Sequence, residues 1–342
     1  MRKAEGTEAI AGAQENGSAR IWLGLAAVST CLIALPYFAK AIGDLALISL
    51  ATRMAIYAIA AASLNLILGY GGLVSFGHAA FFGVGGYVVG VLYSHFVSGD
   101  PFLGLVPGSD QLLVTLPLAV VLSGIVALVL GSLSLRTSGV QFIMITLAFA
   151  QMLFFLFVSL KYYGGDDGLI VRRRNSLPGL DLRDDTTFYF VCVSIAAAYF
   201  GFCAKLVRSR FGLVLGGIRQ NERRMAALGI STYSYKLAAF VIAGMGAGLA
   251  GALAANFARF VSPEMLNWAK SGELMIMVIL GGSGTLIGPA LGAILLIGLE
   301  TVLAAWTEHW QFVLGPILIL IVLFTHGGLW SLLTIRRRGV DE

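Results

Sequence analysis

Apolar runs of about 20 residues alternate with short polar connections along most of this chain. Runs of this length match the roughly 30 Å hydrocarbon core of a bilayer, where only closed secondary structure satisfies every backbone amide and carbonyl. We therefore predict an all-α polytopic membrane protein with about 8–10 transmembrane helices. The predicted spans lie at about residues 21–39, 45–68, 69–92, 112–133, 139–160, 188–204, 235–257 and 311–325, and an interrupted segment lies between residues 273 and 304.

Glycines interrupt two of these apolar segments. The stretch 69–77 is too rich in glycine for a regular helix. Residues 273–305 would reach about 50 Å as one helix, well beyond the bilayer core, so we place a break at residues 281–284. The prediction is a half-helix at 273–280, an irregular turn, and a second helix at about 286–304. This segment either enters and leaves on the outer side or makes two unusual crossings, and its irregular backbone should face the protein interior.

The two interrupted segments are alike in sequence. Residues 68–73 read LGYGGL and residues 280–286 read LGGSGTL, which suggests an internal repeat, with chance similarity as the alternative in a chain that holds 43 glycines. Paired glycine-interrupted spans in the two halves of a transporter point to a central binding site or pathway. We therefore predict a substrate pathway lined by Gly69, Gly71, Gly72, Gly281, Gly282, Ser283, Gly284 and Thr285.

Residues 205–234 form a polar connection in which apolar positions recur at helical spacing. The apolar stripe consists of Val214, Ile218, Met225 and Leu228, and the charged positions around it are Arg219, Glu222, Arg223 and Arg224. Gly212 and the pair Gly216-Gly217 loosen the start of the helix, and Gly229 takes the place of a C-cap glycine. A short amphipathic helix of this kind either docks on a soluble partner or lies on the lipid surface.

Composition and charge set the topology. With 58% hydrophobic and 12% charged residues, the chain has more apolar surface than a soluble domain buries, so its net charge of +5 is a topology signal and indicates no nucleic-acid partner. Residues 205–224 hold six basic residues against Glu222 alone, whereas the loop 161–187 has five basic and five acidic residues. The positive-inside rule then places residues 205–234 in the cytoplasm and the loop outside, with both termini cytoplasmic.

The ends of the chain and one charged residue complete this picture. Residues 1–20 are predicted to be a disordered polar tail, residues 21–335 a single transmembrane domain, and residues 336–342 a cytoplasmic basic tail. Arg53 lies roughly two turns into its span, where it either snorkels to the interface or takes part in transport.

No set of residues supports catalysis or metal binding. There is no Walker A glycine-lysine loop, the cysteines Cys31, Cys192 and Cys203 form no pair motif, and the four histidines have no metal-ligand spacing. The chain is therefore predicted not to be an enzyme. An ion-coupled secondary transporter of small polar solutes is an alternative, but it needs acidic residues at mid-membrane, and Asp44, Glu273 and Glu300 lie near predicted span ends.

Several short motifs occur in a specific order. The polar connection and the following span contain RSRFG at 208–212, IRQNE at 218–222, AALGI at 226–230 and YKLAAF at 235–240; elsewhere the chain has GGDDGL at 164–169, SGE at 271–273 and GGSGTL at 281–286. These motifs resemble the permease family of bacterial branched-chain amino acid ABC transporters, and in particular the longer of its two permease subunits. Asn65, Ser75 and His78 belong to a stretch that resembles the N-terminal signature of the family.

The resemblance implies partners and site residues. It implies that Asn65, Ser75 and His78 join the substrate pathway, although a membrane histidine such as His78 is more often a structural hydrogen-bond donor. It also implies an ATPase-coupling surface formed by Arg210, Gly212, Val214, Ile218, Arg219, Glu222, Met225, Leu228 and Gly229. The implied partners are a homologous permease in a heterodimer, two ATP-binding cassette subunits that carry ATP and magnesium, an extracytoplasmic binding protein and membrane lipid.

The family also implies a location and a cargo. The expected location is the bacterial inner membrane, and the expected cargo is branched-chain or related amino acids, with urea or amides as alternatives. No cofactor is expected on this chain itself.

Overall fold

The computed structural model describes residues 30, 32–101, 107–324, 328 and 329. The chain divides into two compact units, residues 1–49 and residues 50–342. The described part of the first unit contains a short apolar helix, Leu32–Ile42, and the start of α2. The predicted tails, 1–20 and 336–342, lie outside the described residues, as does most of the predicted span 21–39.

Seven helices in the described residues are long and apolar enough to cross a membrane. They are α2 (Ala46–Asn65) with the π-helical turn Leu66–Tyr70 that continues it, α3 (His78–Ser98), α4 (Leu112–Ser134), α5 (Val140–Ser159), α6 (Asp185–Arg208), α9 (Thr232–Ala258) and α11 (Gly288–Trp306). A shorter apolar helix, α12 (Trp310–Phe324), follows them. The prediction of an all-α polytopic membrane protein is confirmed.

One small sheet ties an exposed connection to the end of α9. Strand β1 (Leu169–Ile170) pairs in antiparallel fashion with β2 (Phe260–Val261), with Leu169 opposite Val261. The loop between α5 and α6 is therefore held against the chain that leaves α9.

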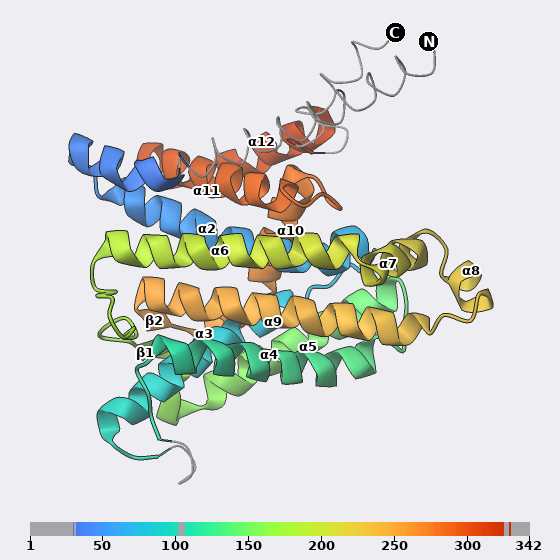
Figure 1. The fold of residues 1–342 in the computed structure, drawn as a ribbon, viewed down its shortest axis with the longest axis horizontal. Helices are drawn as coiled ribbons and strands as arrows, with labels where there is room; N and C mark the ends of the chain where they lie inside the picture. The colour runs from blue at the N-terminus through green and yellow to red at the C-terminus, as the bar shows by residue number, and fades with distance from the viewer. Residues whose placement is uncertain (1–29, 31, 102–106, 325–327, 330–342) are drawn as a thin grey trace, which may run out of the picture. The chain divides into compact units, whose positions relative to one another are not determined.

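Helix α9 lies at the centre of the second unit, packed along α3 and α4 (Figure 1). Close packing is possible because small residues line the contacts. Where α3 crosses α9, a side chain at Gly85 would overlap the backbone of Gly248, and one at Gly251 would overlap the backbone of Phe82. The backbones of the two helices therefore approach each other directly.

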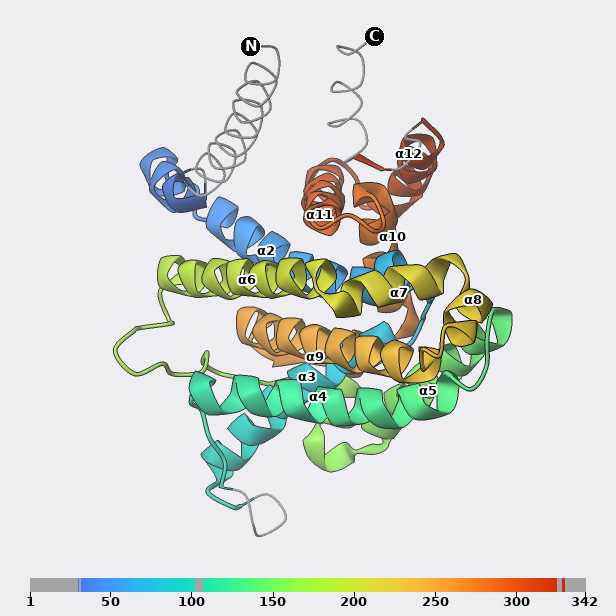
Figure 2. The same cartoon turned by 45° about the vertical axis from the view of Figure 1, so that its right-hand side comes forward.

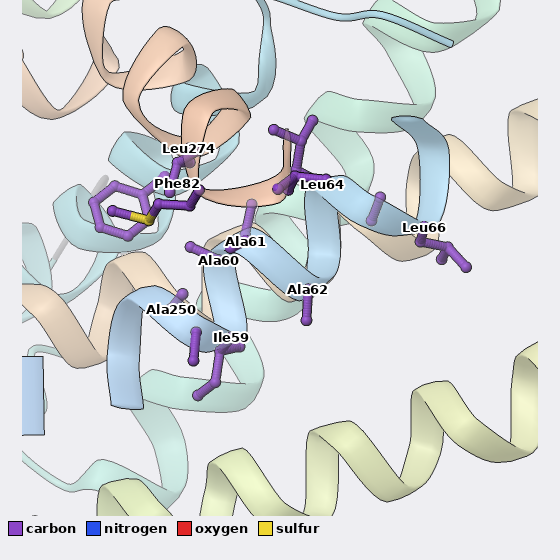
Figure 3. Close-up of a cluster of buried hydrophobic side chains, with 14 of the residues drawn as sticks. Ile59, Ala60, Ala61, Ala62, Leu64, Leu66, Phe82, Ala250 and Leu274 are labelled. Carbon is purple, nitrogen blue, oxygen red and sulfur yellow. The ribbon is translucent and has the colours of Figure 1, made fainter. Parts of the chain in front are cut away.

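The apolar core continues from α9 to the middle of α2. Figure 3 shows Ala60 and Ala61 of α2 on the side of Phe82 of α3 and Leu274 of α10 (Trp268–Gly281), and Ile59 of α2 beside Ala250 of α9. The three α2 residues are 0% exposed. An alanine-rich α2 leaves little side-chain bulk at this crossing. The segment that leads to the glycine-rich stretch is therefore buried inside the unit.

The interrupted segment folds as a hairpin of two helices. Helix α10 has 14 residues, a length of about 21 Å, which is too short for the roughly 30 Å bilayer core. It begins earlier than the predicted residue 273 because Asn267 caps it, accepting a hydrogen bond from the Ala269 amide at 3.2 Å. Irregular residues follow, and α11 then packs back along α10. The predicted sequence of half-helix, turn and second helix is confirmed.

The polar connection folds as two helices, α7 (Arg210–Gln220) and α8 (Glu222–Ala227), at the end of the unit where α6 finishes and α9 begins (Figure 2). The prediction of one apolar stripe from Val214 to Leu228 is wrong, because the helix breaks at Asn221, whose side chain caps α8 through the Arg224 amide. Ile218 is only 3% exposed, so it packs within this chain, whereas Leu213 and Leu228 are 72% and 70% exposed. Gly229 does follow α8 in the left-handed conformation, as predicted.

Candidate functional site

The two glycine-rich segments meet in the structure, and Asn65 joins them. Its side-chain nitrogen donates to the Thr285 carbonyl at 2.8 Å, and its side-chain oxygen accepts from the Gly284 amide at 2.9 Å. Asn65 is the last residue of α2, and the two groups that it binds lie in the turn between α10 and α11. A single side-chain amide therefore bridges the two segments that the sequence pairs; we call this contact the glycine junction.

The glycine junction has no room for side chains at its centre. A Cβ atom at Gly69 would overlap the Asn65 side-chain oxygen and the Gly284 amide nitrogen. Gly284 itself has φ near 79°, a left-handed conformation that glycine adopts without strain. These two glycines are therefore required by the close approach of the backbones.

The polar connection reaches the same junction through Arg219. The Arg219 guanidinium donates to the Gly69 carbonyl, and its side-chain carbons lie against Gly72. Gly69 belongs to the π-helical turn after α2, a local distortion that often occurs at functional positions. Residues predicted for two separate roles, the pathway and the coupling surface, are thus in direct contact.

A cavity of about 250 Å³ lies beside this contact. Its walls come from the glycine-rich stretch, the α4–α5 connection, and α7 to α9: Gly71, Gly72, Leu73, Leu135, Thr137, Ser138, Gly139, Ile218, Arg219, Glu222 and Lys236. The cavity thus adjoins both the glycine-rich stretch and the connection α7–α8.

Internal contacts hold α7 and α8 to the rest of the unit. Glu222 forms an ion pair with Lys236 of α9 at 2.5 Å, and the Met225 side chain lies against Gly217. Gly212 is buried against the backbone of Val207, which brings α7 close to the end of α6. Val214 is half-buried and Arg210 is exposed. These contacts join α7 and α8 to α6 and α9, and Arg219 joins α7 to the junction.

Three of the other predicted pathway residues take no part in the Asn65 hydrogen bonds. His78 is fully buried, and one of its ring nitrogens hydrogen-bonds the Ser63 hydroxyl at 2.8 Å. The Ser75 hydroxyl is also buried and accepts from the Gly77 amide. Ser283 is exposed in the turn after α10. The contacts of His78 and Ser75 are those of structural hydrogen bonds, and a role of these three residues in transport stays a prediction.

A charged cluster in α2, α10 and α11 is not apparent from the sequence. Arg53 donates two hydrogen bonds to Glu300, at 2.9 and 2.8 Å. Lys270 lies 2.6 Å from Glu273 and 3.0 Å from the Tyr57 hydroxyl. Arg53 is thus paired inside the unit, in addition to any snorkelling. Because each carboxylate already has a cation, neither is free to bind a coupling ion, which disfavours the secondary-transporter alternative.

The side chains of this cluster come from helices far apart in the chain, so only an expectation that membrane charges pair could have suggested it. Among the residues that the structure describes, no group of three or more His, Cys, Asp or Glu residues could hold a metal ion.

Comparison with known proteins places these features in a family. The profile described as "Branched-chain amino acid transport system / permease component" matches residues 46–323. The chain is 27% identical to the high-affinity branched-chain amino acid transport system permease protein LivM of Salmonella typhimurium, over 82% of this chain and 69% of that protein, and 26% identical to LivM of Escherichia coli over the same shares. It is also 31% identical to the autoinducer 2 import system permease protein LsrC of Yersinia pestis, over 35% of this chain and 36% of that protein.

No solved structure matches the chain at a significant level. The profile covers all seven long apolar helices, the glycine junction and the connection α7–α8. The chain therefore belongs to the family of permease components of branched-chain amino acid transport systems.

Proposed function

We propose that this chain is the transmembrane permease subunit of an ATP-driven importer of branched-chain or related amino acids. It pairs with a homologous permease, two ATP-binding cassette subunits hydrolyse ATP with magnesium, and an extracytoplasmic binding protein delivers the cargo. The names of the LivM relatives support the cargo class, and the LsrC relative shows that a similar permease serves a different import system. Urea and amides remain the alternative cargo.

The observation that carries this proposal is the contact between Arg219 of α7 and the Gly69 carbonyl. Through this one side chain, the segment proposed to meet the ATPase directly contacts the segment proposed to line the pathway. Arg219 lies in α7 together with the buried Ile218 and Leu215, which anchor that helix in the unit. Movement of α7 and α8 during ATP hydrolysis would therefore pull directly on the glycine junction.

The free energy that holds the two glycine-rich segments together is small enough for the glycine junction to open and close as a gate. It is held by the Arg219 contact and the two Asn65 hydrogen bonds. Net hydrogen-bond contributions are about 0.5–1.5 kcal/mol each, and side-chain bonds between membrane helices average about 0.6 kcal/mol. Opening the junction thus requires a few kcal/mol, which a power stroke transmitted through α7 supplies.

The surface proposed to meet the ATPase differs from the stripe that the sequence predicts. Ile218 is buried in this chain, so the exposed apolar side chains Leu213 and Leu228 are the ones available to a partner. Arg210 and Arg224, which are exposed beside them, supply the charge around this surface. Docking on a soluble subunit is favoured over docking on lipid because α7 already contacts the glycine junction through Arg219.

The proposal includes an orientation in the bacterial inner membrane, with α7, α8 and both termini in the cytoplasm and the loop 161–187 outside. It rests on the contrast between six basic residues against one acidic residue in 205–224 and the neutral loop. An impermeant thiol reagent should label a cysteine at Asn221 only from the cytoplasmic side, and one at Asp181 only from outside. Labelling with the sides exchanged would reject the orientation.

The function is tested by purifying the complex and reconstituting it in proteoliposomes with its binding protein. We expect ATP-binding subunits to co-purify, and uptake of radiolabelled leucine to require ATP on the side of α7 and α8. Uptake that follows a sodium or proton gradient without ATP would instead identify an ion-coupled transporter.

A further inference from the structure

A second cavity, of about 310 Å³, lies at the other end of the unit. Figure 1 shows β1 and β2 at the end of α9 opposite to α7 and α8, and the cavity is lined by residues next to these strands. The lining residues are Arg172, Arg173, Arg174, Arg183, Arg259 and Asp185. We call this feature the arginine cavity.

Acidic and basic residues are interspersed along the loop 161–187, but mainly the basic ones line the arginine cavity. The loop 161–187 contains five aspartates as well as five basic residues, but Asp185 alone of these aspartates lines the arginine cavity. The β1–β2 pairing continues into a hydrogen bond from the Val171 amide to the Arg259 carbonyl at 2.9 Å, which brings the end of α9 next to the arginines 172–174. A locally neutral loop thereby produces a strongly basic cavity.

Two of the five arginines have carboxylate partners. Arg173 pairs with Asp110 at 2.8 Å, and Arg174 pairs with Asp185 at 2.6 Å. Within the described residues, Arg172, Arg183 and Arg259 form no ion pair. The cavity therefore holds a net positive charge that the described part of the chain does not neutralise.

Arg174 adds a buried donor without an acceptor. Its side chain is 7% exposed, and its guanidinium lies 4.5 Å from the ring centre of Phe188. One guanidinium nitrogen donates to the Leu182 carbonyl at 3.1 Å, but the Nε atom is buried and has no hydrogen-bond partner. Buried donors are nearly always paired, so the Arg174 Nε is able to donate to an acceptor that enters the cavity.

Arg259 reaches the cavity from a strained backbone. With φ near 53°, it is the one non-glycine residue in the described part of the chain with positive φ. Glycine would adopt this conformation at the end of α9 without strain. Strain of this kind is often kept at sites where a particular side chain is needed.

We propose that the arginine cavity binds a carboxylate group on the extracytoplasmic side of the membrane. Guanidinium groups match the two oxygens of a carboxylate with paired hydrogen bonds, and several surround this cavity. The side of the membrane rests on the orientation proposed above. The carboxylate belongs either to the amino-acid cargo or to an acidic side chain of the extracytoplasmic protein that delivers it.

The test uses the intact complex in nanodiscs of zwitterionic phosphatidylcholine, so that no anionic lipid competes. The variants are Arg172→Gln and Arg259→Gly, and the matched control is Arg136→Gln, an exposed arginine in the connection between α4 and α5. Arg259→Gly removes the guanidinium and also relieves the positive φ, so it should unfold no more easily than the wild type. Co-purification of the ATPase with this variant shows that a loss of binding does not come from a loss of folding.

The probes distinguish the two sources of the carboxylate. If the cargo supplies the carboxylate, leucine binds the complex in the absence of the binding protein and leucinamide does not. Both variants then weaken the binding of leucine about tenfold. If a protein side chain supplies it, the Kd of the binding protein rises about tenfold in both variants, and glutarate competes with that protein. Either result supports a carboxylate site, and Arg136→Gln should behave as the wild type.

The proposal is overturned if leucine, glutarate and the binding protein all bind the two variants as tightly as they bind the wild type. Co-purification of the ATPase and ATP-dependent uptake are measured on the same preparations. Failure of the carboxylate site in a complex that still transports is thus distinguishable from failure of the proposed function, which appears as uptake independent of ATP.

Discussion

Replacing Gly69 by alanine tests the glycine junction most directly. The added methyl group would overlap the Asn65 side-chain oxygen and the Gly284 amide nitrogen. The two segments must then separate, which breaks both Asn65 hydrogen bonds and displaces the carbonyl that Arg219 binds. The change therefore affects the whole junction although it adds one carbon atom.

The magnitude follows from these contacts. Three hydrogen bonds at the membrane average of about 0.6 kcal/mol give roughly 2 kcal/mol, and forcing a methyl group into a packed site adds about 1–3 kcal/mol if the site cannot relax. Together these two contributions lower the expected free energy of unfolding of Gly69→Ala by about 3–5 kcal/mol. SDS-driven unfolding in mixed micelles, followed by circular dichroism, measures this change.

Gly201→Ala is the matched control. Gly201 lies in α6, and nothing lies within 4 Å of the place where its Cβ would be. Because alanine favours a helix over glycine by about 1 kcal/mol, this variant should be as stable as the wild type or more stable. If Gly69→Ala unfolds at the same SDS fraction as Gly201→Ala, the backbones do not approach each other at Gly69 as closely as described.

Two further predictions concern α7–α8 and the charged cluster. Leu228→Asp, at an exposed position, should leave the permease folded but unable to co-purify with its ATPase, whereas Ile218→Asp should destabilise the chain itself by several kcal/mol, because Ile218 is buried. Normal ATPase binding by Leu228→Asp would rule out this docking surface. Arg53→Met should cost about 2–3 kcal/mol of stability by leaving Glu300 unpaired, and Arg53→Met with Glu300→Leu should recover most of it. A double-mutant cycle with no coupling energy would contradict the ion pair.

Much of the fold is predictable from the sequence because it depends on neighbouring residues. The apolar runs predict α4 and α5 within a few residues, and the glycine cluster predicts the break after α10. Gly229 marks the end of α8 for the same local reason, since few other residues adopt its left-handed conformation. Family motifs in the sequence likewise indicate the permease family, which the profile over residues 46–323 confirms.

The sequence alone gives a wrong picture where a side chain has two possible environments. Ile218 has the spacing of an exposed stripe, but the structure buries it. The stripe does not continue to Leu228 because one helix ends at Gln220 and a new one starts after the Asn221 cap. Helical periodicity assigns residues to one face only while the helix is continuous. Asn221 is a helix N-cap residue type, so the sequence does contain a local signal that separates α7 from α8.

Tertiary structure alone decides which distant residues share a site. Arg219 and Gly69 are 150 positions apart, and Arg53 and Glu300 are 247 apart, so no local pattern joins either pair. The arginine cavity likewise forms only when β1 pairs with β2 and brings Arg259 to a loop whose own charge is neutral. Backbone preference acts over a few residues and is readable from sequence, whereas charge pairing and close approach depend on which helices pack together.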